Sequence, residues 1–195
     1  MLMGENKVYI ETERLVIREF ESADWQEVYD YTSDSAVMKY IPEGVFSEED
    51  AKAFVDGNRG GNAEKFSVVL KGEDILIGHI SFHKYFGEHT YEIGWVFNPK
   101  YYNKGYASEA ARAMVEFGFK EMKLHRIIAT CQPENPASYR VMEKIGMRRE
   151  GYFKKCIPQG DGWWDEYYYA ILAEELQQPK YKEFGFSEGT ACRFR

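Results

Sequence analysis

The stretch Glu92-Ile-Gly-Trp-Val-Phe-Asn-Pro-Lys-Tyr-Tyr-Asn-Lys-Gly-Tyr-Ala-Ser-Glu-Ala110 decides how this chain folds. Its first part reads as a strand that Asn98-Pro99 ends, and a short loop then leads to Gly105. A helix follows, because small and apolar residues recur at helical spacing. They are Ala107, Ala110, Ala111, Met114, Val115 and Gly118. A strand, a glycine loop and a helix in this order bring free backbone N–H groups to a helix N-terminus, where an anion is favoured.

Short strands and helices surround this stretch on both sides. Strands are expected over 8–10, 15–20, 66–70, 75–82, 91–97, 126–131, 152–157 and 166–172. Helices are expected over about 24–31, 36–40, 47–58, 105–120 and 135–146. The pattern stops near Leu176, so we expect one domain over residues 1–176 and a C-terminal tail over 177–195. The tail is a loose end, a partner contact or a cloning remnant, and the sequence does not decide among them.

Composition narrows the class of protein. With 195 residues and 44% hydrophobic residues, the chain can build a full core. A formal net charge of −7 repels phosphate backbones, which argues against nucleic acid and fits a cationic partner better. Cys131, Cys156 and Cys192 are odd in number and widely spaced, which argues against a disulfide framework and a zinc site. The polar start over residues 1–7 and the lack of a membrane-length apolar run favour the cytoplasm.

The loop before Gly105 has two readings on physical grounds alone. It is an anion site whose small residues let a diphosphate approach the backbone, or it is an ordinary strand–loop–helix connection. The dinucleotide fingerprint Gly-x-Gly-x-x-Gly is absent, and so is a P-loop ending in Gly-Lys-Ser/Thr. A phosphate bound here would need a third mode of binding.

The same loop resembles motif A of the GNAT superfamily of N-acetyltransferases, Gln/Arg-x-x-Gly-x-Gly/Ala. Tyr102-Asn103-Lys104-Gly105-Tyr106-Ala107 matches it, with Tyr102 in place of Gln/Arg and Asn103 where many relatives have Gly. Three further stretches, 11–18, 135–151 and 165–172, resemble the branch typified by ribosomal-protein N-terminal acetyltransferases (RimJ/RimL-like). Together the resemblance spans residues 8–175.

The resemblance implies a fold and a co-substrate. The fold would be α+β (mixed α/β), with a central, twisted, mostly antiparallel sheet of about seven strands and helices on both faces. The co-substrate would be acetyl-CoA, with no metal. Its phosphates would lie on the backbone of the loop before the helix that starts near Gly105. Its thioester carbonyl would lie near Val96 and Phe97, and its pantetheine arm near Asn135. These positions are Val96, Phe97, Tyr102, Asn103, Lys104, Gly105, Tyr106, Ala107, Ser108 and Asn135.

Two residues are candidates for the chemistry of an amine attacking a thioester. Glu92 shares a strand face with Gly94 and is the candidate base, although a solvent-facing glutamate is equally compatible. A peptide α-amine, with a pKa of about 7.7–8.0, is roughly one-tenth neutral at pH 7 and needs only a modest base. Ser138 and Met142 lie on the inward-facing stripe of their helix. At the position of Met142, many members of the family have a tyrosine that acts as the general acid. By resemblance Ser138 protonates the thiolate; a helix cap is the alternative.

Residues that could line an acceptor pocket are less sharply defined. Tyr40, Phe82 and Tyr85 are candidates by analogy with the family, and equally candidates for the core. Asp165 and Glu166 are candidates for an acidic acceptor site. His79 and His83 share a strand face, but no third metal ligand lies near them in the sequence.

Three functional hypotheses follow. The first is an N-acetyltransferase that acts by direct attack in a ternary complex on a protein or peptide α-amine, or on a small amine such as an antibiotic or polyamine. The second is a non-catalytic acyl-CoA-binding module. The third, an α/β nucleotide-binding domain, is disfavoured because consecutive hairpin strands precede the loop. Monomer and homodimer both remain open.

Overall fold

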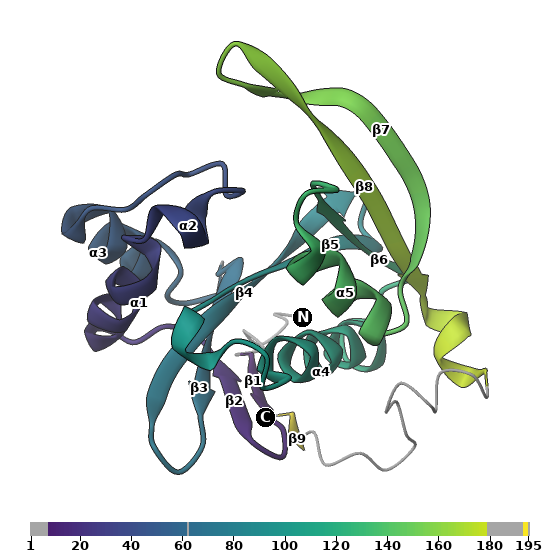
Figure 1. Ribbon diagram of the computed structural model, residues 1–195. Helices are drawn as coiled ribbons and strands as arrows, with labels where there is room; N and C mark the ends of the chain where they lie inside the picture. The colour runs from purple at the N-terminus through teal and green to yellow at the C-terminus, as the bar shows by residue number, and fades with distance from the viewer. Residues whose placement is uncertain (1–7, 62, 179–192, 195) are drawn as a thin grey trace.

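One twisted sheet forms the centre of the computed structural model, which describes residues 8–61, 63–178 and 193–194 (Figure 1). Within those residues nine strands are hydrogen-bonded in the order β7-β8-β6-β5-β4-β3-β2-β1-β9. The bounds are β1 Tyr9–Glu11, β2 Leu15–Arg18, β3 Lys65–Leu70, β4 Ile75–Phe86, β5 Thr90–Phe97, β6 Arg126–Cys131, β7 Arg148–Gln159, β8 Gly162–Leu172 and β9 Arg193–Phe194. Only β5 and β6 run parallel; the other neighbours are antiparallel. The expected mixed fold is confirmed. The strand count exceeds seven because the opening strand is split and β9 adds an edge.

Helices cover both faces of this sheet (Figure 1). The helices are α1 Trp25–Thr32, α2 Ser35–Met38, α3 Glu48–Gly57, α4 Tyr106–Lys120 and α5 Pro136–Lys144, with 3-10 turns η1 Ser22–Asp24, η2 Pro99–Tyr101 and η3 Ala173–Gln177. Ser47 and Asp50 form the expected capping box at the start of α3. Asn135 and Pro136 start α5 as predicted, because the asparagine accepts a backbone hydrogen bond and proline suits the first turn.

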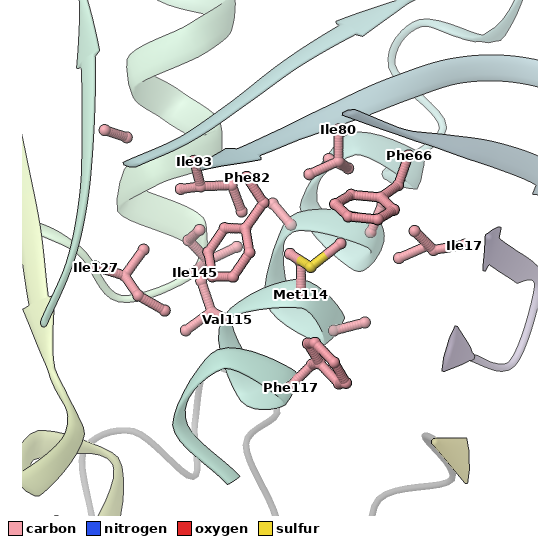
Figure 2. Close-up of a cluster of buried hydrophobic side chains, with 14 of the residues drawn as sticks. Ile17, Phe66, Ile80, Phe82, Ile93, Met114, Val115, Phe117, Ile127 and Ile145 are labelled. Carbon is pink, nitrogen blue, oxygen red and sulfur yellow. The ribbon is translucent and has the colours of Figure 1, made fainter. Parts of the chain in front are cut away.

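The larger core lies between the sheet and α4 (Figure 2). Gly118 allows close approach here: a Cβ at this position would lie 2.8 Å from Phe82 Cζ and 2.9 Å from Ile127 Cδ1. Phe82 is only 4% exposed and packs in this core, so its predicted place in the acceptor pocket is wrong. The reason is alternation along β4, which turns Ile80 and Phe82 toward α4 and His79 toward the opposite face.

The second core lies on that opposite face, beneath α1 and α3. His79 is buried there, and its Nδ1 is 2.7 Å from the Tyr31 hydroxyl oxygen. The rings of Phe20 and Phe54 lie against the imidazole. Burial, assisted by the charge of Lys65, lowers the pKa of His79 to about 3. His79 is therefore a neutral core residue that supports the sheet from α1.

Part of the predicted tail belongs to the sheet. Gln177 ends η3, and Phe194 and Arg193 pair with Ile10 and Glu11 of β1. The predictions for residues 1–7, for Cys192 and for most of the tail fall outside the described residues. Among the helices that the structure describes, none is long and apolar enough to cross a membrane.

Candidate active site

A gap between two parallel strands creates the main pocket. β5 pairs with β6 only where Thr90–Glu92 lie beside Arg126–Ile128. Beyond Glu92, β5 continues along β4 to Phe97, whereas β6 continues along β8 to Cys131. The pocket of about 620 Å³ is lined by residues of α2, this part of β5, the loop before α4, the end of β6 and α5. Its size suits a small-molecule ligand.

Backbone groups of β5 face this gap. The N–H of Asn98 donates to Ile77 O of β4 at 2.9 Å. Because successive residues of a strand point their N–H groups to opposite sides, Val96 also points toward β4, while Trp95 and Phe97 point toward the gap. The N–H groups of Trp95 and Phe97 are therefore directed at a ligand in the gap. Val96, predicted to lie near the thioester carbonyl with Phe97, contributes only to the lining.

The N-terminus of α4 forms the second wall. Gly105 caps the helix with φ 83°, and Asn103 before it also has positive φ, 61°. Such angles suit glycine and asparagine. The first intrahelical bond is from the Glu109 N–H to Gly105 O at 3.0 Å, so the three preceding N–H groups have no acceptor within the helix. These belong to Tyr106, Ala107 and Ser108, which line the pocket with Tyr102 and Asn103.

The loop is held by the N-terminal hairpin. Glu109 accepts hydrogen bonds from Thr12 Oγ1 at 2.6 Å, the Arg14 backbone N–H at 2.9 Å and Arg14 Nε at 2.6 Å. Arg14 Nη1 in turn donates to Lys104 O at 3.0 Å. Lys104 is thus fixed through its carbonyl and does not line the pocket. Two other basic residues, Arg140 and Lys144, do line it. Together these contacts fix the loop that leads into α4.

The start of α5 forms the opposite wall. Asn135 accepts a hydrogen bond from the Ser138 N–H at 3.3 Å, so its side chain caps the helix. The Ser138 hydroxyl meets the Cys131 thiol, and burial raises the pKa of that thiol to about 12 even though the hydroxyl opposes the shift. Asn135, Cys131 and Ser138 all line the pocket beside Met142. Asn135 is therefore the N-cap of α5, and Ser138 lines the pocket.

Glu92 lies where the two strands part. Its Oε1 accepts a hydrogen bond from Thr130 Oγ1 at 3.1 Å, and its Oε2 is 3.6 Å from His83 Nε2. Glu92 is not itself among the residues that line the pocket, but its neighbours Ile93 and Gly94 and its partner Thr130 are. Glycine at 94 avoids a contact, because a Cβ there would lie 2.5 Å from Ser81 Oγ.

The predicted acceptor residues are dispersed. Tyr40 lines the pocket, its hydroxyl donating to Glu134 O at 3.0 Å and its ring 5.5 Å from that of Trp164. Tyr85 is 51% exposed beside Tyr168, on the sheet face that bears Glu92. Asp165 is not brought to the pocket: it accepts from the Lys155 N–H at 2.8 Å and from the Tyr152 hydroxyl, both within the β7–β8 hairpin.

Comparison with known proteins settles the family. Residues 14–148 match the family described as acetyltransferase (GNAT) domain. The chain belongs to the GNAT acetyltransferase family. It is 78% identical over 168 residues to the uncharacterized N-acetyltransferase YnaD of Bacillus subtilis, covering 86% of this chain and 99% of YnaD. It also superposes on a GNAT-family acetyltransferase of Bacillus anthracis with a TM-score of 0.83 and 75% identity, covering 86% and 99% of the two chains.

A more distant relative is the [ribosomal protein uS5]-alanine N-acetyltransferase of Escherichia coli. It is 25% identical over 179 residues, which cover 85% of this chain and 91% of the relative. This GNAT chain is therefore an acetyl-CoA-dependent N-acetyltransferase, whose acceptor is an amine.

Three side chains in or beside this GNAT site were not among its predicted residues. Thr130 reads as an ordinary strand residue, Arg14 as a surface charge, and Cys131 as an isolated thiol. Thr130 and Arg14 contact partners distant in sequence, Glu92 and Glu109, whereas Cys131 lines the pocket together with nearby Ser138. The one local signal was that Thr130 is polar and follows the apolar residues 127–129 of its strand.

Proposed function

We propose that this GNAT enzyme acetylates the N-terminal α-amine of a protein or peptide by direct attack in a ternary complex. The observation that carries the proposal is Glu92, whose carboxylate lies beside the gap and contacts a hydroxyl and an imidazole. Such a carboxylate can accept a proton. It is a modest base, and an α-amine is the acceptor that needs no stronger one.

The residues of the gap divide the chemistry among them. Acetyl-CoA supplies a thioester whose carbonyl carbon the amine nitrogen attacks and whose carbon–sulfur bond then breaks. Phe97 and Trp95 stabilise the negative oxygen through their N–H groups. Glu92 takes the proton lost by the nitrogen, directly or through water. Ser138 donates its hydroxyl hydrogen to the departing sulfur and regains one from solvent.

The walls of the pocket offer groups that would hold the co-substrate. The N–H groups of Tyr106, Ala107 and Ser108 would hold the diphosphate, and the open side of β5 would hold the pantetheine arm. Asn135, which caps α5, lies at the same pocket. No group of three or more His, Cys, Asp or Glu side chains among the described residues is placed to hold a metal, and none of these steps uses one.

The RimJ/RimL-like branch and a cytoplasmic location belong to the same proposal. The branch is supported by the motifs over 11–18, 135–151 and 165–172 and by the 25% identity to the uS5-alanine enzyme. The location is supported by Cys131 and Cys156, which are both free thiols.

An acceptor panel tests the proposal. The panel contains peptides with free N-termini, the same peptides N-blocked with one internal lysine, polyamines and aminoglycosides; thiol release and mass spectrometry report the transfer. Acetylation of the free N-termini alone is expected. Acetylation of polyamines or aminoglycosides alone would show a small-amine enzyme, and tight CoA binding without any transfer would show a binding module.

Two variants test the assigned roles. Glu92→Gln and Ser138→Ala should each lower kcat at least about tenfold while leaving the affinity for CoA unchanged in calorimetry. Full turnover of Glu92→Gln would remove the base from the mechanism. A loss of CoA affinity equal to the loss of turnover in Ser138→Ala would reduce that residue to a binding role.

A further inference from the structure

A row of aromatic rings crosses the sheet on the face that bears Glu92. The ring centroid of Tyr168 lies 6.3 Å from that of Tyr85 and 6.1 Å from that of Phe153. Tyr168 belongs to this face because it pairs with Thr130, whose hydroxyl donates to Glu92. The two outer rings are open to solvent, since Tyr85 is 51% and Phe153 50% exposed. Tyr85, Tyr168 and Phe153 together form the aromatic row.

The aromatic row lies on the side of Glu92 that faces away from the gap. His83 of β4 pairs with Glu92 of antiparallel β5, and Gly94 and the gap lie in the opposite direction along β5 from Tyr85. Tyr85 follows His83 by two residues, which is roughly 6 to 7 Å along the strand. An amine that reached a thioester in the gap past Glu92 would therefore have the row behind it, within two or three residues of an extended chain.

The position of the Tyr85 ring is set by an irregularity in β4. Lys84 and Phe86 pair with consecutive residues of β5, so Tyr85 is the extra residue of a β-bulge. Bulges turn a side chain in a new direction and are common beside active sites. β4 and β8 are three strand spacings apart, roughly 14 Å. Because the Tyr85 and Tyr168 rings nevertheless lie 6.3 Å apart, both lean toward each other across β5 and β6.

The charges of this face suit a cationic end group. Glu166 lies on the same face as Glu92, because it pairs with Phe153 of the aromatic row. Arg126 is also on this face, but its charge is offset by Glu150. Carboxylates attract an ammonium group, and aromatic rings accept both a cation and an apolar side chain. The face therefore suits a molecule that has an amine at one end and an apolar group close to it.

A second aromatic contact lies farther along β8. The ring of Tyr40, which lines the pocket, is 5.5 Å from that of Trp164. Trp164, Glu166 and Tyr168 alternate along β8 and so share one face, which places Glu166 between the two aromatic contacts. The β7–β8 hairpin, which supplies rings to both contacts, extends beyond the rest of the sheet (Figure 1). A surface of this length suits an extended peptide better than a small amine.

We propose that the aromatic row is a subsite for an apolar side chain of the acceptor peptide, close to its reacting N-terminus. The proposal rests on the proposed function, because it requires a peptide acceptor. With the amine beside Glu92, an extended chain advances about 3.3 Å per residue, so the second or third residue reaches Tyr85. The row thus selects among protein N-termini by the side chains that follow the first residue.

Peptides that differ at one residue test this subsite. Each begins with a free alanine and carries alanine, leucine, phenylalanine or aspartate at its second or third residue. At one of these two positions, leucine or phenylalanine in place of alanine should raise kcat/KM about tenfold, because the side chain is buried against the rings; aspartate should not raise it. Equal kcat/KM values across the series, or a preference for aspartate, would contradict the proposal.

Matched variants locate the preference on the row. Tyr85→Ala and Phe153→Ala should each lower kcat/KM about fivefold for the phenylalanine peptide, while the alanine peptide and the KM for acetyl-CoA stay within about twofold. Tyr85→Phe keeps the ring and should behave as wild type. Tyr152→Ala is the control and should change neither peptide, because Tyr152 is also 50% exposed on β7 but packs on Tyr167 of the opposite face. Equal losses for both peptides in the row variants would indicate a merely structural role and refute the subsite.

Calorimetry of peptides binding to the enzyme–CoA complex gives a readout without turnover. The phenylalanine peptide should bind about tenfold more tightly than the alanine peptide, and Tyr85→Ala should remove most of this difference. Failure to acetylate any free N-terminus would refute the proposed function and this subsite together. Acetylation of free N-termini without a side-chain preference, or with one that Tyr85→Ala and Phe153→Ala both keep, would refute the subsite alone.

Discussion

Replacing His79 by glutamine should reduce the amount by which the free energy of unfolding of this enzyme falls as the pH is lowered. The imidazole is 5% exposed and bonded to Tyr31, and its pKa is lowered to about 3 by burial and by Lys65. In the unfolded chain the same group has a pKa of about 6.5. Below pH 6.5 His79 therefore binds a proton in the unfolded chain but stays neutral in the folded protein, which favours unfolding.

The magnitude follows from these two values. The contribution of His79 is present in full above pH 6.5 and is lost as the pH falls toward 3, at up to about 1.4 kcal/mol per pH unit. Between pH 7.5 and 5.5 the free energy of unfolding should fall by about 1.4 kcal/mol because of His79 alone. Carboxyl groups add their own slopes, so the informative quantity is the difference between wild type and His79→Gln.

Urea unfolding at pH 7.5 and 5.5, followed by tryptophan fluorescence, measures this difference. Phe54→Leu is the matched control, because its ring lies 5.0 Å from the imidazole and does not titrate. That variant should lose stability equally at both pH values and keep the wild-type slope. If His79→Gln keeps the wild-type slope too, then His79 is not a neutral core residue, and the account of the second core fails.

Three further substitutions test the core and the loop. Gly118→Ala should lower the free energy of unfolding by about 1 kcal/mol. Overpacking against Phe82 costs about 1–3 kcal/mol, which outweighs a gain in helix propensity of about 1 kcal/mol. Increased stability in urea unfolding would contradict this. Glu109→Gln should weaken CoA binding about fivefold in calorimetry by releasing Arg14 from the loop, and unchanged affinity would show that the clamp does not order the anion site. Gly105→Ala should cost about 1–2 kcal/mol of folding stability from its φ of 83° alone, since the nearest atom to a new Cβ is 3.5 Å away; a stabilised variant would refute the strain.

Local signals made most of the fold predictable from the sequence. The capping box at Ser47 and Asp50, the Asn135-Pro136 start and the small-residue stripe after Gly105 each specify an element within a few residues. The motif around Gly105 placed the start of α4 correctly for the same reason, because a helix N-terminus is a local structure. The predicted strands were clearly shorter than observed in β4, which continues past Phe82 to Phe86, and in the β7–β8 hairpin, which runs over 148–172. The end of β4 and most of β7 are exposed and so lack a strong apolar alternation.

Features that depend on pairing between distant segments were not predictable. No local pattern states which face of β4 meets α4, so Phe82 was placed in the pocket when it lies in the core. The direction of the Phe97 and Val96 N–H groups depends on the β4–β5 ladder. The contact of Thr130 with Glu92 depends on the short parallel pairing of β5 with β6.

The central claim is that the gap between β5 and β6 holds acetyl-CoA with its diphosphate on the start of α4. A crystal structure of the enzyme grown with CoA tests this most directly. The account predicts diphosphate oxygens within hydrogen-bond distance of the N–H groups of Tyr106, Ala107 and Ser108, and a pantetheine arm beside Trp95 and Phe97. CoA bound elsewhere, or a gap closed by the enzyme's own side chains, would contradict it.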